Sequence, residues 1–173
     1  MINKGKGGGN TITGLNFEKE VDILTLLKSK KGYKVVGNII YYQDKEVAKN
    51  FRKNGLYKFL ASEGVDYKKI LSKKLLPDEA MYVILNNTLF IIEIKFQKVA
   101  GSVAEKLPTC DFKRKQYAKL MAPLNIEVEY IYILSEWFNK PEYKDVRDYI
   151  ISVGCQYYFK YLPLQKLGLP VPK

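Results

Sequence analysis

The chain has 173 residues, of which 47% are hydrophobic and 13% aromatic, and this suits one folded domain with a sizeable core. Lysine and arginine outnumber aspartate and glutamate by 29 to 18, a formal charge of +11 that favours a polyanionic partner, above all nucleic acid. Histidine is absent, which excludes Ser-His-Asp and Cys-His catalysis and zinc sites with histidine ligands.

The cysteines and the apolar runs bear on the cellular compartment. Cys110 and Cys155 are too few for a disulfide framework or for a zinc site made of cysteine alone, so we expect two free thiols. No apolar run approaches the roughly 18 residues of a transmembrane helix. The first residues, MINKGKGGGN, lack the apolar core of a signal peptide. We therefore expect a cytoplasmic protein that does not associate with a membrane.

The predicted elements begin after a glycine- and lysine-rich stretch. We expect residues 1–13 to form a flexible basic arm and residues 14–173 to form one domain. Apolar residues at intervals of three and four predict a helix over residues 16–31, which ends at Gly32. Residues 33–42 are rich in β-branched and aromatic side chains and predict a strand. Residues 45–74 mix short helical patterns with lysines and give no clear element.

The second half of the chain alternates strands with helices. Its clearest unit is MYVILNNTLFIIEIKF, residues 81–96, in which two β-rich runs flank Asn86-Asn87 and predict a hairpin. An irregular segment follows Gln97. The remaining predicted elements are a basic helix over 110–122, a strand over 127–135, a helix over 143–152 and a strand over 155–162. This order predicts an α/β fold around a mixed sheet.

The length of the hairpin turn decides which side chains share a face of the sheet. A two-residue turn at Asn86-Asn87 places Asp78 opposite Lys95 and brings Glu93 onto the same face, because alternate residues of a strand point the same way. A turn one residue longer would separate Asp78 from Glu93. The other face is apolar and consists of Met81, Val83, Leu85, Phe90, Ile92, Ile94 and Phe96.

Two carboxylates beside an ammonium, on a strand that is otherwise apolar, indicate a site for a hard cation. Carboxylate oxygens suit Mg²⁺, for which Mn²⁺ can substitute, and the ion can polarise a scissile phosphate and acidify its bound water. Lys95 could orient or deprotonate the attacking water, or stabilise charge on the phosphate. We also considered a structural alternative, in which Glu93 and Lys95 form an ion pair on an edge strand that prevents aggregation.

Pro77-Asp78 and Glu93-Ile94-Lys95, separated by residues 79–92, resemble the motif of the PD-(D/E)xK nucleases. The resemblance covers residues 14–135. It implies a restriction endonuclease-like fold of three α/β/α layers around a mixed sheet, and Mg²⁺-dependent cleavage of DNA. It also implies that Asp78 and Glu93 bind the metal and that Lys95 assists the attacking water.

A third carboxylate often comes from the first helix in this family. Gly14-Leu-Asn-Phe-Glu18-Lys-Glu20 looks like the G-x-x-x-E-[KR]-E start of archaeal junction-resolving nucleases, which favours Glu18. Helical spacing favours Glu20, which has apolar residues at i+3, i+4 and i+7. We favour Glu18 and keep Glu20 as the alternative metal ligand. A solvated glutamate at the start of a helix is the structural explanation for either.

Residues that follow the Glu93 strand are candidates for substrate contacts. Gln97 lies two positions beyond Lys95 and could touch the phosphate or the attacking water. The predicted DNA contacts in the following loop and helix are Ser102, Lys106, Thr109, Lys113, Arg114, Lys115 and Lys119. In the structural alternative, Gln97 is a surface amide at the end of a strand, residues 98–109 form an ordinary surface loop, and the basic residues from Lys113 to Lys119 lie on a solvated helix face.

These features predict a metal-dependent DNA endonuclease. We expect a type II restriction enzyme that acts on double-stranded DNA as a homodimer, because one active site cuts one strand. A repair or junction-resolving nuclease of the same fold is the second hypothesis, and a non-catalytic DNA-binding subunit is the third.

Overall fold

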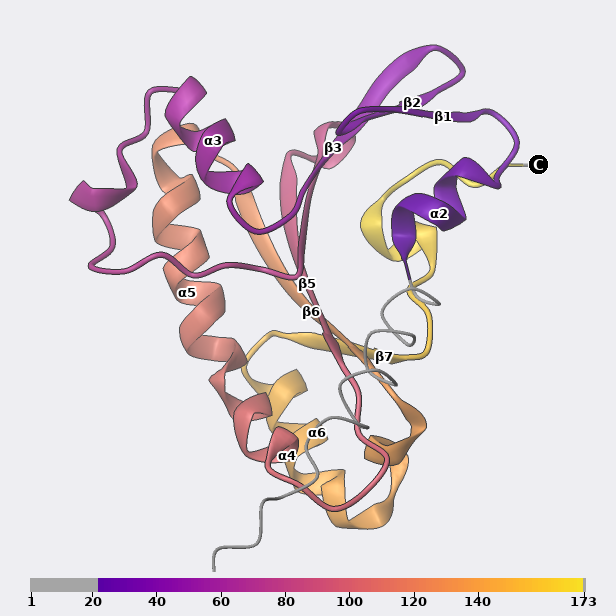
Figure 1. Ribbon diagram of the computed structural model, residues 1–173, viewed down its shortest axis with the longest axis vertical. Helices are drawn as coiled ribbons and strands as arrows, with labels where there is room; N and C mark the ends of the chain where they lie inside the picture. The colour runs from indigo at the N-terminus through magenta and orange to yellow at the C-terminus, as the bar shows by residue number, and fades with distance from the viewer. Residues whose placement is uncertain (1–21, 173) are drawn as a thin grey trace, which may run out of the picture.

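Residues 22–172 of the chain are described by a computed structural model, in which a seven-stranded mixed sheet forms the centre (Figure 1). The predicted α/β fold is confirmed. The strands follow one another across the sheet in chain order: β1 (Tyr33–Val36), β2 (Ile39–Tyr42), β3 (Lys45–Phe51), β4 (Glu79–Val83), β5 (Thr88–Lys95), β6 (Glu127–Leu134) and β7 (Gln156–Phe159).

The helices lie on both faces of the sheet. They are α2 (Ile23–Lys28), α3 (Gly55–Ser62), α4 (Val103–Lys106), α5 (Cys110–Met121) and α6 (Lys144–Ser152). Single 3₁₀ turns occur at Tyr67–Lys69, Ile84–Asn86, Leu107–Thr109, Ala122–Leu124, Glu136–Asn139, Pro141–Tyr143 and Leu164–Leu167. None of the helices within residues 22–172 has the length and apolar character needed to cross a bilayer.

Each face of the sheet has its own hydrophobic core. On one face, α3, α5 and α6 pack against the strands and enclose side chains such as Leu56, Leu120 and Ile150 (Figure 1). On the other face, α2 and the C-terminal segment cover the strands with Ile23, Leu27 and the leucines of residues 162–169. The sheet is therefore the middle of three layers.

The central strand β5 explains the long apolar run in the sequence. It pairs antiparallel with β4 and parallel with β6, and Thr88 to Ile94 are all buried. A strand covered on both faces needs apolar residues on both sides, so it reads as a nearly continuous hydrophobic run. Because β5 lies between two other strands, the structural alternative of an ion pair on an edge strand is wrong.

Most of the predicted elements of the second half are confirmed. The helix predicted over 110–122 is α5, and the strand predicted over 127–135 is β6, each one residue shorter than expected. The helix predicted over 143–152 is α6, which begins one residue later, and the strand predicted over 155–162 is β7, which covers only Gln156–Phe159. The predicted arm over 1–13 and the start of the helix predicted over 16–31 lie outside the described residues.

The first half differs from the sequence-based prediction in three places. The helix predicted to run to residue 31 ends at Lys28. The single strand predicted over 33–42 is two strands, because Gly37 adopts a positive φ of 60° and the chain reverses direction there. Residues 45–51, which gave no clear element, form β3 between β2 and β4.

The turn between β4 and β5 is longer than predicted. Val83 pairs with Thr88, so the turn spans residues 84–87 and the predicted two-residue turn is wrong. Leu85 lies in this turn and is 56% exposed, although it was expected on the apolar face. The turn is two residues longer than predicted. Because the side chains of a strand alternate between the two faces with a period of two, this difference leaves Asp78 and Glu93 on the same face. Continuing the register by one residue places Asp78 opposite Glu93 rather than opposite Lys95.

We expect Asn87→Ala to destabilise the protein by about 2 kcal/mol. Asn87 has a φ of 53°, and its side chain accepts a hydrogen bond from the Tyr82 hydroxyl and donates one to the Asn125 carbonyl. Alanine loses both bonds, which are exposed and together contribute about 1 kcal/mol, and its strain at this φ costs about another 1 kcal/mol. Urea denaturation measures the change. Asn87→Gly relieves the strain and should cost about half as much; equal stability of wild type and Asn87→Ala would contradict the prediction.

Candidate active site

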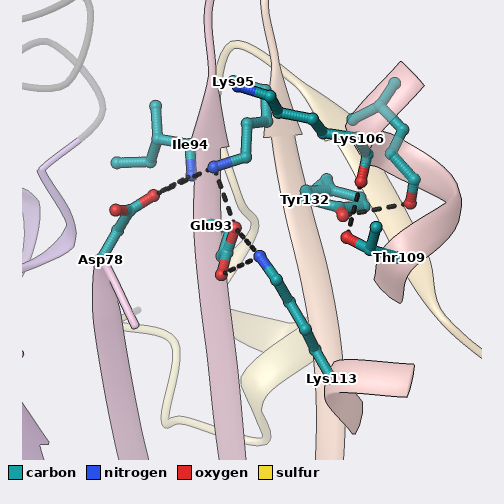
Figure 2. Close-up of polar contacts among 9 residues, drawn as sticks. Asp78, Glu93, Ile94, Lys95, Lys106, Thr109, Lys113 and Tyr132 are labelled. Carbon is teal, nitrogen blue, oxygen red and sulfur yellow. Dashed lines mark hydrogen bonds and ion pairs between the residues drawn. The ribbon is translucent and has the colours of Figure 1, made fainter. Parts of the chain in front are cut away.

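The two predicted carboxylates lie on neighbouring strands of the sheet. Asp78 directly precedes β4, and its Oδ2 accepts a hydrogen bond of 3.1 Å from the backbone amide of Ile94 on β5 (Figure 2). This bond fixes Asp78 beside Glu93. Asp78 is 41% exposed at its side chain whereas Glu93 is only 6% exposed, so Asp78 lies at the mouth of the site and Glu93 at its base.

Lys95 joins the two carboxylates. Its Nζ lies 2.8 Å from Glu93 Oε2 and 3.6 Å from Asp78 Oδ2 (Figure 2). Lys95 follows Glu93 by two residues on β5, so both side chains leave the same face of the sheet. The structure therefore brings together the three residues that the sequence singled out, and both carboxylates face one common cation position.

A second lysine binds Glu93 from α5. Lys113 Nζ lies 3.0 Å from Glu93 Oε1 and 3.1 Å from Oε2 (Figure 2). Lys113 was predicted as a DNA contact, and its pairing with Glu93 was not foreseen. The sequence contains no signal for it, because the contact depends on how α5 packs across β5 and β6.

The charges at the site determine the ionisation of Glu93 and Lys95. Burial alone would raise the pKa of Glu93, but the ammonium groups of Lys95 and Lys113 outweigh burial and hold that pKa below its usual range. Burial would lower the pKa of Lys95, but the carboxylates of Glu93 and Asp78 outweigh it and raise that pKa. Glu93 is therefore ionised and Lys95 protonated at neutral pH.

Two tyrosines of β6 form the floor beneath Glu93. Tyr132 pairs with Glu93 in the sheet, and its hydroxyl donates a hydrogen bond of 3.1 Å to the Leu107 carbonyl. Tyr130 packs edge-on against Tyr132 with the ring centroids 5.4 Å apart. Burial raises the pKa of Tyr130 and the charge of Glu93 raises it further, yet its hydroxyl makes no well-formed hydrogen bond within residues 22–172. The aromatic floor limits access of water to Glu93 from below.

Gln97 holds the loop that follows β5. Its side chain is buried, and the amide nitrogen donates hydrogen bonds to the carbonyls of Val99 at 2.9 Å and Gly101 at 3.3 Å. Its backbone amide donates to the Ser135 hydroxyl at 3.2 Å. The amide nitrogen thus shapes the loop, while Oε1 is buried without a partner among the described residues. A direct role of Gln97 toward phosphate or water stays a prediction.

The other predicted DNA contacts divide into exposed side chains and side chains with internal partners. Ser102, Lys106, Lys115 and Lys119 are exposed, and Lys115 pairs with Asp111 at 2.7 Å. The Thr109 hydroxyl donates to the Lys106 carbonyl at 2.7 Å. Arg114 donates to the Val153 carbonyl at 3.2 Å and so links α5 to the end of α6. The exposed lysines remain available to an external phosphate.

An ion-paired cluster on the opposite face supports the site from behind. Arg52 donates to Glu79 Oε1 at 2.6 Å and to Asp22 Oδ1 at 3.0 Å. Asp22 caps α2 by accepting from the Leu24 amide, so Arg52 ties the start of α2 to the β4 residue next to Asp78. Burial raises the pKa of Glu79 although Arg52 opposes the change. Sequence reasoning missed this cluster.

The residues at the site fit a hard divalent cation. Asp78 and Glu93 supply carboxylate oxygens that already converge on the Lys95 ammonium, and Mg²⁺ in proteins is typically held by one or two carboxylates plus waters. Glu18 and Glu20, the candidates for a third carboxylate, lie outside the described residues. Within residues 22–172 no cluster of three or more histidine, cysteine, aspartate or glutamate side chains forms a ready-made metal site.

Comparison of the chain with models of known protein families, with curated proteins and with solved structures found no match. The function of the chain is therefore argued from its site, since a fold alone does not determine function.

Proposed function

We propose that the chain is a Mg²⁺-dependent DNA endonuclease with a PD-(D/E)xK-type active site on a restriction endonuclease-like fold. The observation that supports this most strongly is the convergence of Asp78 and Glu93 on the ammonium of Lys95. Asp78 and Glu93 would hold the metal ion, which supplies a charge that polarises the scissile phosphate and acidifies a bound water.

Lys95 acts as a cation in this proposal. Its raised pKa keeps it protonated at neutral pH, so it is suited to orient the attacking water and to stabilise charge that develops on the phosphate. Lys95 is less suited to remove a proton from the water, because a base must be unprotonated to accept a proton.

The substrate is proposed to be double-stranded DNA. A formal charge of +11 favours a polyanion, and the exposed lysines of α4 and α5 (Lys106, Lys115 and Lys119) belong to the elements that follow the Glu93 strand. Such contacts to phosphate position DNA without reading its sequence. A type II restriction enzyme that cuts both strands as a homodimer is the preferred assignment, since one site cuts one strand.

The proposal is tested by incubating the wild-type protein with plasmid and genomic DNA in Mg²⁺, with EDTA as the control, and by sequencing the ends. We expect cleavage in Mg²⁺ and none in EDTA. Ends that share one short sequence would identify a restriction enzyme. Cleavage confined to four-way junctions or mismatches would favour the repair or junction-resolving alternative.

A non-catalytic DNA-binding subunit would give a different outcome. It would bind duplex DNA in EDTA as tightly as in Mg²⁺ and would cleave no substrate in Mg²⁺ or Mn²⁺. That result would overturn the assignment as an endonuclease.

A further inference from the structure

We propose that Lys113 is an internal counter-ion of the metal site: it binds Glu93 while the site lacks a divalent cation, and it turns to the substrate phosphate when a cation binds. This inference rests on the proposed function. It assigns to Lys113 a positioning role that differs from a plain contact with the DNA backbone, because the same ammonium serves two partners in turn.

The contacts of Glu93 carry the first step. Both of its carboxylate oxygens accept from Lys113, at 3.0 and 3.1 Å, and Oε2 also accepts from Lys95 at 2.8 Å. Glu93 is nearly fully buried, so water cannot take the place of these partners freely. Three of the roughly four acceptor positions of this carboxylate are therefore taken by ammonium groups, which compete with a divalent cation for Glu93.

The charge balance of the site carries the second step. Asp78 and Glu93 carry two negative charges, and Lys95 and Lys113 carry two positive charges, so the group is neutral as it stands. A divalent cation beside Glu93 would repel both ammonium groups at close range. Movement of one ammonium away from the cation would reduce this repulsion, and the phosphate of a DNA substrate would bring the negative charge that receives it.

The positions of the two lysines indicate which one moves. Lys95 is held by both carboxylates and is anchored on β5 two residues from Glu93. Lys113 comes from a separate element, α5, and contacts only Glu93 of the two carboxylates; its side chain is 28% exposed against 23% for Lys95. Rotation of its side chain can carry the ammonium outward without a backbone change. Lys113 is therefore the mobile cation of the pair.

The experiment compares the Mn²⁺ affinity of the wild type with that of Lys113→Met, measured by electron paramagnetic resonance on the full-length proteins. We expect Lys113→Met to bind Mn²⁺ about tenfold more tightly, which corresponds to one charge-assisted hydrogen bond. Lys115→Met is the matched control on the same helix, and its Mn²⁺ affinity should equal that of the wild type. The gain should disappear when Glu93→Gln is combined with Lys113→Met.

The rate of DNA cleavage by Lys113→Met should fall, although its Mn²⁺ affinity rises. At saturating Mg²⁺, Lys113→Met should cleave DNA about tenfold more slowly than the wild type, because the ammonium that meets the phosphate is gone. If Lys113→Met does not fold, Lys113→Gln replaces it in both measurements.

Equal or weaker Mn²⁺ binding by Lys113→Met would overturn the inference. If the wild type then still cleaves DNA in Mg²⁺, the proposed function stands without it. If neither protein binds Mn²⁺ and neither cleaves DNA, both the inference and the proposed function are overturned. If Lys113→Met binds Mn²⁺ more tightly but cleaves DNA at the wild-type rate, the proposed contact of Lys113 with the substrate phosphate is overturned.

Discussion

Lys95→Met is expected to slow DNA cleavage by about 10²–10³-fold at saturating Mg²⁺, the usual effect of removing one preorganised group that stabilises a transition state. The Lys95 ammonium contacts both carboxylates and is protonated at neutral pH, so it is positioned to stabilise negative charge on the phosphate. Methionine keeps the length and apolar stem of the side chain but removes the charge. Single-turnover cleavage of a fixed DNA substrate measures the effect.

The control for this prediction is a lysine outside the site. Lys166 is exposed in the C-terminal segment, which covers the other face of the sheet, and Lys166→Met should cleave DNA within about threefold of the wild-type rate because it is far from the reacting groups. Lys95→Met should still bind Mn²⁺, because both carboxylates remain. Cleavage by Lys95→Met at the wild-type rate would show that Lys95 has no part in the reaction.

Glu93→Gln is expected to lower the free energy of unfolding by about 3 kcal/mol in metal-free buffer at neutral pH. The variant keeps the volume of the side chain but leaves Lys95 and Lys113 facing a neutral amide at a largely buried position. Breaking a buried ion pair by removing one partner typically has a cost of this size. Urea denaturation of both proteins in EDTA measures it.

The difference in stability between the wild type and Glu93→Gln should depend on pH. The pKa of Glu93 is lower in the folded protein than the value of about 4.3 expected in the unfolded chain. Its ionised form therefore stabilises the fold above about pH 4.3, and this contribution is lost as the pH falls through the folded-state pKa. Because glutamine mimics protonated glutamate, the stability difference between the two proteins should shrink progressively as the pH falls below about 4.3 toward the lowered folded-state pKa of Glu93.

Glu127 provides the control for the pH series. It is exposed at the start of β6, and Glu127→Gln should change stability by less than about 0.5 kcal/mol at every pH, as expected for a surface site. A stability difference between wild type and Glu93→Gln that stays constant from pH 7 to pH 3 would contradict the role assigned to the ionised carboxylate.

The sequence alone was sufficient to predict the central strand and the polar residues that it carries. Glu93 and Lys95 stand out because β5 is otherwise apolar, and Asp78 was placed on their face by counting from the hairpin turn. The count was wrong by two residues, since the turn forms a 3₁₀ turn that ends at Asn87 in the left-handed conformation. The period of a strand is two residues, so the error moved the partner of Asp78 from Lys95 to Glu93 without changing the face.

Other features could not be obtained from local patterns. β3 was missed because Lys45, Glu46 and Lys49 interrupt its apolar residues, and burial in the sheet outweighs this weak local signal. The contact of Lys113 with Glu93 depends on the packing of α5 across the sheet. The link of Arg52 to Asp22 and Glu79 joins three distant parts of the chain, and no spacing rule predicts it.

The most direct test of the active site compares Mg²⁺-dependent DNA cleavage by the wild type and by Asp78→Asn. Asp78 is partly exposed, so the substitution should leave the fold intact while it removes one proposed metal ligand. Asp44→Asn is the matched control, because Asp44 is exposed in a turn with a φ of 62° that asparagine tolerates. We expect the wild type and Asp44→Asn to cleave DNA in Mg²⁺ and Asp78→Asn to lose at least about 10²-fold in rate. Equal cleavage by all three proteins would contradict the assignment of this site.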